Sequence, residues 1–484
     1  MNRFLNGLTN ATNYNLTTNG ALAHKTTGSA VYDLFSFGGA YRNRSDDDVV
    51  FLFSKAFAED PKYALKCLFY LRDVRGGQGE RRFFRLCMRW LAIYNREAAK
   101  RNLQHIPFYG RWDDLYTFVD TPLEAAAFSI IKEQLALDMT CKTPSLLAKW
   151  LKSENTSSAE SCRLGNLTRQ ALGMSHKQYR KTLSILREKI NIVERLMSAN
   201  KWELIEFDKI PSKAGLIYKN AFARRDIIKA KYETFIKDEN TKVNAKTLYP
   251  YEVVREAINA RYYAVGSTER MAVNKYWDNL TDYFADKTFN GLAVVDTSGS
   301  MMGAPINVAI SLGLYCAERA NGPFANHYIS FASRPQLIKT DGYDFVDKVD
   351  RIYRTNLVDN TNLLATFELV LNTAIKNHCS QEDLPENLII ISDMQIDSAR
   401  GYRSSSMETE MESVHRMFER AGYKIPHLIY WNVNASNDTI LDGTDGVTYV
   451  SGCSPVIFEQ ILTGKRGLDL MYDKLNSERY APIG

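Results

Sequence analysis

The sequence predicts an α-helical repeat domain followed by an α/β doubly wound domain. From about residue 30 to residue 265, apolar residues recur at spacings of three and four, which indicates amphipathic helices. After Gly291, short apolar runs alternate with helical patterns, which is typical of a sheet covered by helices. Because 484 residues also exceed one ordinary domain, we divide the chain into a polar arm (1–27), a helical domain (28–285) and an α/β domain (286–484).

The arm, residues 1–27, is rich in Asn and Thr and has no apolar pattern from which a core forms. We expect it to be flexible or to lie against a neighbouring surface. It lacks the basic start and apolar centre of a signal peptide, and no stretch of the chain approaches the roughly 20 apolar residues of a membrane span. The sequence therefore predicts no membrane association.

In the helical domain, short turns separate consecutive helices, which predicts a stacked, HEAT-like array. The repeats are irregular, since the sequence has no fixed period. The predicted helices span 49–57, 61–71, 81–94, 122–137, 145–151, 175–197, 202–207, 212–220, 223–237 and 250–260.

The predicted strands of the α/β domain span 291–295, 327–331, 336–339, 388–392, 427–432 and 446–450. Helical patterns at 305–320 and 364–376 lie between strands. This alternation predicts a doubly wound sheet, and such a sheet binds ligands at the carboxyl ends of its strands.

One motif lies where the first predicted strand ends. Asp296, Ser298 and Ser300 place a carboxylate and two hydroxyls two residues apart. Gly299 permits the tight turn that directs both hydroxyls toward one point. Such oxygens suit Mg²⁺, which takes six oxygen ligands and keeps some as water. The alternative is that these groups only cap helices and tie loops.

Two more oxygen ligands occur downstream: Thr361 at a loop-to-helix junction, and Asp393 after a later apolar run. A D-x-S-x-S motif followed by such residues resembles the metal-ion-dependent adhesion site of von Willebrand factor A domains. The resemblance implies a Rossmann-like A domain in which Ser298, Ser300 and Thr361 offer hydroxyl oxygens to the metal. It also implies that Asp296 and Asp393 contact the metal directly or through water. Mg²⁺ is the expected ion, with Mn²⁺ or Ca²⁺ as alternatives.

Charge and cysteine content narrow the function classes. The net charge is only +5, so a basic surface for nucleic acid must be local. Seven scattered cysteines form no C-x-x-C pair, which argues against a disulfide framework and a zinc site and favours a reducing compartment, the cytoplasm. The seven histidines do not cluster, and no P-loop or kinase signature is present. We therefore expect no enzyme activity.

A segment rich in glycine and arginine joins two predicted helices at 71–82. Its three glycines stand just before a helix start, where exposed backbone N–H groups attract anions. The arginines in and beside it are Arg72, Arg75, Arg81, Arg82 and Arg85. If they share a face, phosphate is the expected ligand. The alternative is an inter-helix turn whose arginines pair with Asp73, Glu80 and nearby acids.

A second segment, 108–115, places aromatic residues around an arginine. We interpret it as a packed turn in which Asp113 or Asp114 caps a helix.

Two later helical stretches, 163–189 and 213–231, are basic and contain interleaved tyrosines. Such side chains bind single-stranded RNA by neutralising phosphates and stacking on bases. The alternative is that each is a solvated helix face. The candidate RNA-binding residues are Arg169, Lys177, Arg180, Lys181, Arg224 and Arg225.

Four segments, RDVRGGQGER, YGRWDDL, SLLAKWLKSE and LIIISDMQID, resemble the Ro (TROVE-domain) ribonucleoprotein family. They are more similar still to its uncharacterised relatives in plants, fungi and large viruses. The resemblance runs from about Tyr32 to Leu462. It implies a ring of helical repeats closed by the A domain, with single-stranded RNA ends in the central hole and small structured RNA on a basic outer face.

We therefore expect an RNA-binding ribonucleoprotein scaffold. Its partners are single-stranded or small structured RNA, together with an acidic protein partner docked through the metal of the A domain. The alternative is a metal-dependent protein-interaction or assembly module that does not bind RNA.

Overall fold

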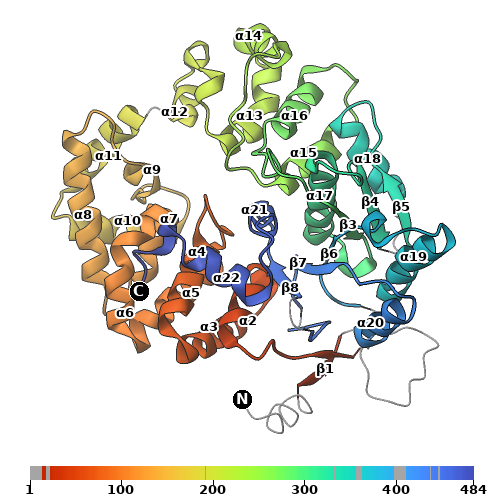
Figure 1. Cartoon of the computed structure of the whole chain (residues 1–484). Helices are drawn as coiled ribbons and strands as arrows, with labels where there is room; N and C mark the ends of the chain where they lie inside the picture. Colours follow the sequence, from red (N-terminus) through yellow and green to blue (C-terminus); the bar gives the residue numbers. More distant parts are fainter. Residues whose placement is uncertain are drawn as a thin grey trace.

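The computed structural model describes residues 13–17, 22–190, 192–331, 334–355, 362–396, 410–436, 438–444 and 447–484. Within them a helical domain precedes an α/β domain, as the sequence predicts. Figure 1 shows the helices following a curved path from α2 (Ala30–Phe37) to α16 (Thr268–Asp278), with the α/β domain between the two ends of this path.

Between α2 and α16, the chain forms α-helices and several 3-10 turns. The α-helices are α3 (Asp46–Glu59), α4 (Pro61–Arg72), α5 (Arg81–Tyr94), α6 (Arg96–Asn102), α7 (Ile106–Tyr109), α8 (Glu124–Thr140), α9 (Leu147–Trp150), α10 (Ala159–Ala171), α11 (His176–Ile190), α12 (Val193–Ser198), α13 (Ser212–Arg224), α14 (Asp226–Lys237) and α15 (Pro250–Ala260). The 3-10 turns are η1 (Gly38–Asn43), η2 (Leu103–His105), η3 (Trp112–Phe118), η4 (Trp202–Leu204) and η5 (Phe207–Lys209).

Local signals explain where these helices begin and which side they bury. At the start of α4, the Asp60 side chain accepts a hydrogen bond from the Tyr63 backbone N–H, and Pro61 occupies the first turn. In α5 the buried residues Phe84, Cys87 and Leu91 recur at spacings of three and four. Predicted and observed bounds coincide for α5 and for α15.

Two predicted helices are interrupted in the structure. The predicted helix at 175–197 is two helices, α11 and α12, that change direction around Ile192, whose backbone is extended. The predicted helix at 202–207 is two 3-10 turns, η4 and η5, because Ile205 and Glu206 between them also have extended backbones. Apolar spacing alone does not report such local breaks.

The α/β domain contains strands β3 (Gly291–Asp296), β4 (His327–Phe331), β5 (Gln336–Lys339), β6 (Asn387–Ser392), β7 (His427–Asn432) and β8 (Thr448–Ser451). Its helices and 3-10 turns are η6 (Gly299–Met301), α17 (Ala304–Arg319), α18 (Phe345–Thr355), α19 (Leu363–Lys376), η7 (Gln381–Asp383), α20 (Glu410–Arg420), α21 (Val456–Ile461), α22 (Gly467–Leu475) and η8 (Glu478–Tyr480).

The strand order of this sheet is doubly wound. The described strands run β5-β4-β3-β6-β7-β8, and neighbours are parallel except for β4 and β5. The chain moves outward from β3 in one direction and then restarts at β6 on its other side. The switch point of the topology therefore lies between β3 and β6, and ligands of open α/β sheets bind at such a point.

The polar arm contributes a short hairpin. Strands β1 (Tyr14–Leu16) and β2 (Leu22–His24) pair antiparallel, and His24 exchanges backbone hydrogen bonds with Ile440 in the α/β domain. The Thr17 hydroxyl donates to the Ile396 carbonyl at 2.7 Å. Of the two expected behaviours of the arm, its described part lies against a neighbouring surface.

Both ends of the helical path contact the α/β domain. At the first end, the Gly39 N–H donates to the Ser451 hydroxyl at 3.0 Å. At the other end, Arg270 of α16 forms two hydrogen bonds of 2.8 Å with the Asp344 carboxylate. The C-terminal turn η8 returns to the helical domain, where the Tyr480 hydroxyl bonds to Asp73 at 3.0 Å. No helix in the described ranges is long and apolar enough to cross a membrane.

Candidate functional site

Asp296 closes β3 at the switch point of the sheet and is completely buried. One of its carboxylate oxygens accepts the Ser298 backbone N–H at 2.9 Å, and the other accepts the Ser392 hydroxyl at 2.5 Å. The Ser298 and Ser300 hydroxyl oxygens lie 3.1 Å apart. The D-x-S-x-S loop thus gathers its oxygens at the carboxyl edge of β3.

Asp393 follows β6 on the other side of the switch point and is also buried. Its carboxylate accepts the Gln395 backbone N–H at 3.1 Å, and the Ser300 hydroxyl is a further hydrogen-bond partner. The next residue, Met394, has a φ of 62°, a left-handed conformation that is costly for a residue other than glycine. Backbone strain is therefore stored beside this carboxylate.

Burial raises the pKa of both carboxyl groups. For Asp296, burial and the nearby negative charge of Asp393 raise the pKa to about 7. For Asp393, burial raises the pKa, and hydrogen bonds from Gln395 and Ser300 partly oppose the rise. The groups that hydrogen-bond to these two buried carboxylates are all neutral.

Four of the five predicted metal ligands, Asp296, Ser298, Ser300 and Asp393, lie together in this way. The fifth, Thr361, lies outside the described residues. The donor set consists of carboxylate and hydroxyl oxygens, which fits Mg²⁺, Mn²⁺ or Ca²⁺ and does not fit a soft metal.

Ser392 belongs to the same site and was missed in the sequence. Its hydroxyl donates to Asp296 and accepts the Met394 backbone N–H at 3.0 Å, so it joins the two carboxylate loops. Its position as the last residue of the predicted strand 388–392 was the available signal, because carboxyl ends of adjacent parallel strands meet at one edge.

The glycine- and arginine-rich segment is a packed turn. Its backbone N–H groups are used within the chain: Arg75 and Gly76 donate to the Asp73 carboxylate, and Gln78 and Gly79 donate to backbone carbonyls. A side chain at Gly77 would overlap the Tyr70 carbonyl. The glycines therefore permit close packing, and the structure supports the inter-helix turn over the phosphate loop.

The arginines of this segment mostly have acidic or carbonyl partners. The prediction that Arg72 contacts RNA is wrong, because Arg72 is buried and its guanidinium pairs with Asp114 at 2.7 Å. Arg85 pairs with Asp113 and Asp114, Arg82 pairs with Asp46, and Arg75 donates to the Phe108 carbonyl at 2.9 Å. Arg81 is exposed at the start of α5.

The aspartates of the segment 108–115 do more than cap a turn. Asp114 accepts the Arg111 backbone N–H, as a cap does, but its buried carboxylate also holds two guanidinium groups. Arg111 lies 4.0 Å from the centroid of the Trp150 ring. This segment and the preceding turn form one buried polar network that joins α4, α5 and α9.

The first basic stretch leaves several cations free. Lys177, Arg180 and Lys181 lie at neighbouring positions on the exposed side of α11, and in the described part of the chain no carboxylate lies within ion-pair distance of them. Arg169, by contrast, pairs with Glu154 at 2.9 Å and donates to the Met174 carbonyl.

The second basic stretch is less available. Arg224 contacts Glu269 at 3.4 Å and the Tyr263 hydroxyl at 2.9 Å. Arg225 donates to the Asn200 side chain at 3.0 Å and lies 4.8 Å from the centroid of the Trp202 ring. Both guanidinium groups are exposed yet held by neighbours.

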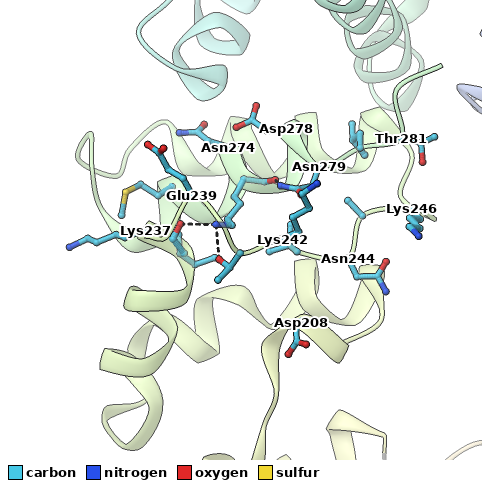
Figure 2. Close-up of a pocket in the computed structure, with 17 residues that line it drawn as sticks. Asp208, Lys237, Glu239, Lys242, Asn244, Lys246, Asn274, Asp278, Asn279 and Thr281 are labelled. Carbon is cyan, nitrogen blue, oxygen red and sulfur yellow. Dashed lines mark hydrogen bonds between the residues drawn. The ribbon is translucent and has the colours of Figure 1, made fainter. Parts of the chain in front are cut away.

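A cavity of ≈ 1250 Å³ lies where α14 and α16 meet the segment 239–246. Figure 2 shows acids and lysines around it, with Asp278 at one edge and Asp208 at the opposite one. Lys275 in its wall is already bound, since its ammonium group donates to the Asp238 carbonyl at 2.6 Å and the Thr241 hydroxyl at 3.0 Å. With charges of both signs around it, this cavity shows no preference for a phosphate backbone.

Two family models match the chain. Residues 17–132 and 137–288 match a domain of unknown function, DUF2828, and residues 290–479 match a second one, DUF7788. An uncharacterised protein of Acanthamoeba polyphaga mimivirus is 30% identical over 501 residues, which cover 94% of this chain and 85% of the viral protein. A relative from a large virus is of the kind that the sequence motifs indicated.

Among solved structures, the crystal structure of the Ro (RSR) protein of Deinococcus radiodurans is similar to this chain. The TM-score is 0.49 and the sequence identity is 12%, over 91% of this chain and 100% of the Ro chain.

Proposed function

We propose that this chain, which belongs to the family of proteins defined by the DUF2828 domain, is an RNA-binding scaffold whose α/β domain docks a partner through a divalent cation. The function is binding without catalysis. It would place single-stranded or small structured RNA on the helical domain and an acidic group of a partner at the cation, in a reducing compartment such as the cytoplasm.

The exposed side of α11 is the observation that carries the RNA proposal. Lys177, Arg180 and Lys181 present three positive charges there, and none has a carboxylate partner in the described chain. Cations that are already paired must lose a partner before they bind phosphate, whereas these three bind at no such cost. The tyrosine interleaved with these cations, Tyr179, is buried and packs in the core, so the proposal rests on the three charges and not on stacking.

Salt-dependent RNA binding tests this proposal. The affinity of the whole protein for a fluorescent single-stranded oligouridine is measured by anisotropy over a range of salt concentrations. Each phosphate contact contributes about 0.7 to the slope of log affinity against log salt, so replacing all three residues by Ala should reduce the slope by about 2.

A matched control removes three exposed lysines from the α/β domain, Lys376, Lys424 and Lys465. This variant has the same net charge as the α11 variant and should keep the slope of the unmodified protein. No RNA binding, or equal slopes for the two variants, would contradict an RNA site on α11.

The buried carboxylates support the cation proposal. Burial raises the pKa of Asp296 and of Asp393, and Ser298 and Ser300 add hydroxyl oxygens beside them. A divalent cation would offset both negative charges and offer open coordination positions to a carboxylate or phosphate of the partner. Thr361 is the remaining ligand that the sequence motif implies.

Metal titration followed by thermal unfolding tests it. We expect Mg²⁺ or Mn²⁺ to raise the melting temperature of the unmodified protein, because a ligand that binds only the folded state stabilises it. Asp296→Asn should abolish this shift, while Asp341→Asn, an exposed carboxylate of the same domain, should preserve it. A shift that survives in Asp296→Asn would place the cation elsewhere.

A further inference from the structure

A second cavity, ≈ 570 Å³, lies between α11, α12 and the segment 153–155. Its volume is within the range of sites for small organic ligands. Three arginines line it, namely Arg180, Arg187 and Arg195. Tyr179, Leu183 and Ile192 add apolar surface to the wall. The cavity therefore combines a cationic side with an apolar side.

Arg187 is held in place in this wall. Its guanidinium donates to the Ala148 carbonyl at 2.8 Å, the Leu151 carbonyl at 2.9 Å and the Ser153 hydroxyl at 3.1 Å. All three acceptors are neutral, so the hydrogen bonds orient the guanidinium without neutralising it. Burial lowers the pKa of Arg187, but an arginine stays charged in proteins. The result is a fixed positive charge that has no carboxylate partner among the residues that the structure describes.

The other charged groups of the wall do not neutralise it. Glu154 already accepts Arg169 and His176, each at 2.9 Å. Arg195 pairs with Glu188 at 3.1 Å. Arg180 is exposed at the cavity, and in the described chain neither Arg180 nor Arg187 has a carboxylate partner. The two carboxylates of the wall are Glu154 and Glu194.

We propose that this cavity binds a phosphorylated nucleotide, with the phosphate at Arg180 and Arg187 and the rest of the nucleotide against the apolar side. A guanidinium suits this task because its planar fork binds phosphate oxygens in pairs. The inference rests on the proposed RNA function, since Arg180 belongs both to the α11 surface and to the cavity. The nucleotide is a free mononucleotide or the phosphorylated end of a bound strand.

Calorimetric titration of the whole protein with UMP, uridine and inorganic phosphate tests the cavity. UMP should bind more tightly than either fragment. Arg180→Ala should weaken UMP binding about tenfold or more, the usual effect of losing a hydrogen bond to a charged group. Lys376→Ala is the control: it removes the same charge from an exposed residue of α19, which does not line the cavity, and should change UMP affinity less than about twofold.

Arg187→Lys keeps the charge and removes the fork, and it should also weaken UMP binding. Arg187 also holds the segment 148–153 in place through its hydrogen bonds. The thermal unfolding of the Arg187→Lys variant is therefore measured in parallel, and the decisive comparison is the one made with Arg180→Ala. Equal affinities for UMP and uridine, equal affinities for UMP and inorganic phosphate, or equal effects of Arg180→Ala and Lys376→Ala would overturn the proposal.

Competition with oligouridines identifies the source of the nucleotide. Tighter binding of a strand with a 5′- or 3′-phosphate than of an unphosphorylated strand supports capture of a strand end, and tighter binding of UMP supports a free nucleotide. RNA binding without UMP binding would overturn the cavity and leave the proposed function standing. UMP binding without RNA binding would overturn the proposed RNA function and leave the nucleotide site in the cavity standing.

Discussion

At the scale of single residues, Asp114 shows how the helical domain uses its charges. The carboxylate is fully buried and accepts Arg72 at 2.8 Å and Arg85 at 2.7 Å. Arg72 is itself buried, so Asp114 is the group that keeps a positive charge in the interior. Removing one partner of such a pair leaves an uncompensated buried charge.

Asp114→Asn keeps the shape of the side chain and removes its charge. We expect the free energy of unfolding to fall by about 3 to 5 kcal/mol, measured by urea denaturation. The control, Asp46→Asn, removes an exposed partner of Arg82 and should cost less than about 1 kcal/mol. Similar losses for both variants would contradict the role of burial.

His415 and Asp442 form an ion pair at 2.8 Å that gives stability a pH dependence. The hydrogen bond to Asp442 raises the pKa of His415 above its ordinary value of 6.5. Burial raises the pKa of Asp442, but hydrogen bonds from His415 and Thr444 outweigh it and lower the pKa overall, below the ordinary 3.8.

The contribution of this pair should therefore be full between about pH 4 and pH 6.5 and be lost as the pH rises through the raised pKa of His415. It should also be lost as the pH falls through the lowered pKa of Asp442. Melting temperatures of the unmodified protein and His415→Gln should differ more at about pH 6 than at about pH 9. A difference that does not vary with pH would count against the charged pair.

At the scale of elements, the predictable parts are those set by local pattern. The apolar runs 327–331 and 427–432 become β4 and β7 with the predicted bounds, because both strands lie inside the sheet and are largely buried. The metal motif follows from the same logic, since Asp296 and Asp393 each close such a run.

The turn at 72–81 shows why other parts were not predictable. Glycines serve an anion loop and a tightly packed turn equally well, and the deciding partners are distant: Arg479 and Tyr480 bind Asp73, and the Tyr249 hydroxyl donates to the Gln78 carbonyl. Ser392 was missed for a similar reason, because the carboxylate to which its hydroxyl donates, Asp296, lies on the neighbouring strand. Long-range packing decides what local pattern leaves open.

Gly313 of α17 tests the packing of a helix on the sheet behind the candidate metal site. A Cβ at this position would overlap the Val295 side chain on β3. Helix propensity alone predicts that Gly313→Ala stabilises the protein by about 1 kcal/mol. We expect instead a loss of about 1 to 3 kcal/mol in urea denaturation, because the overlap forces helix and strand apart. A gain in stability would show that α17 does not approach β3 so closely.

At the scale of the whole molecule, contacts between distant segments close the helical path onto the α/β domain. The turn η8 is one such contact, because Arg479 binds the Asp73 carboxylate and lies 5.1 Å from the centroid of the Phe108 ring. In Figure 1, α11 lies on the opposite side of the molecule from the sheet. The proposed RNA and cation sites are therefore separate, and variants of one should leave the other unchanged.

Arg479→Ala should loosen the turn at 73–80 without unfolding the protein. The backbone N–H groups of Arg75 and Gly76 both donate to Asp73, so their hydrogen exchange should accelerate about tenfold when Asp73 loses its guanidinium partner. Glu478→Ala, an exposed change in the same turn, is the control. Unchanged exchange in Arg479→Ala would show that the C-terminal turn does not hold this segment.

Crosslinking tests directly whether the helical domain binds RNA. The whole protein is irradiated with a bound single-stranded RNA, and the crosslinked peptides are identified by mass spectrometry. We expect crosslinks on α11 and around the cavity at Arg180 and Arg187, and their loss in the variant with Ala at 177, 180 and 181. Crosslinks confined to the α/β domain, or no crosslinks at all, would contradict an RNA-binding helical domain.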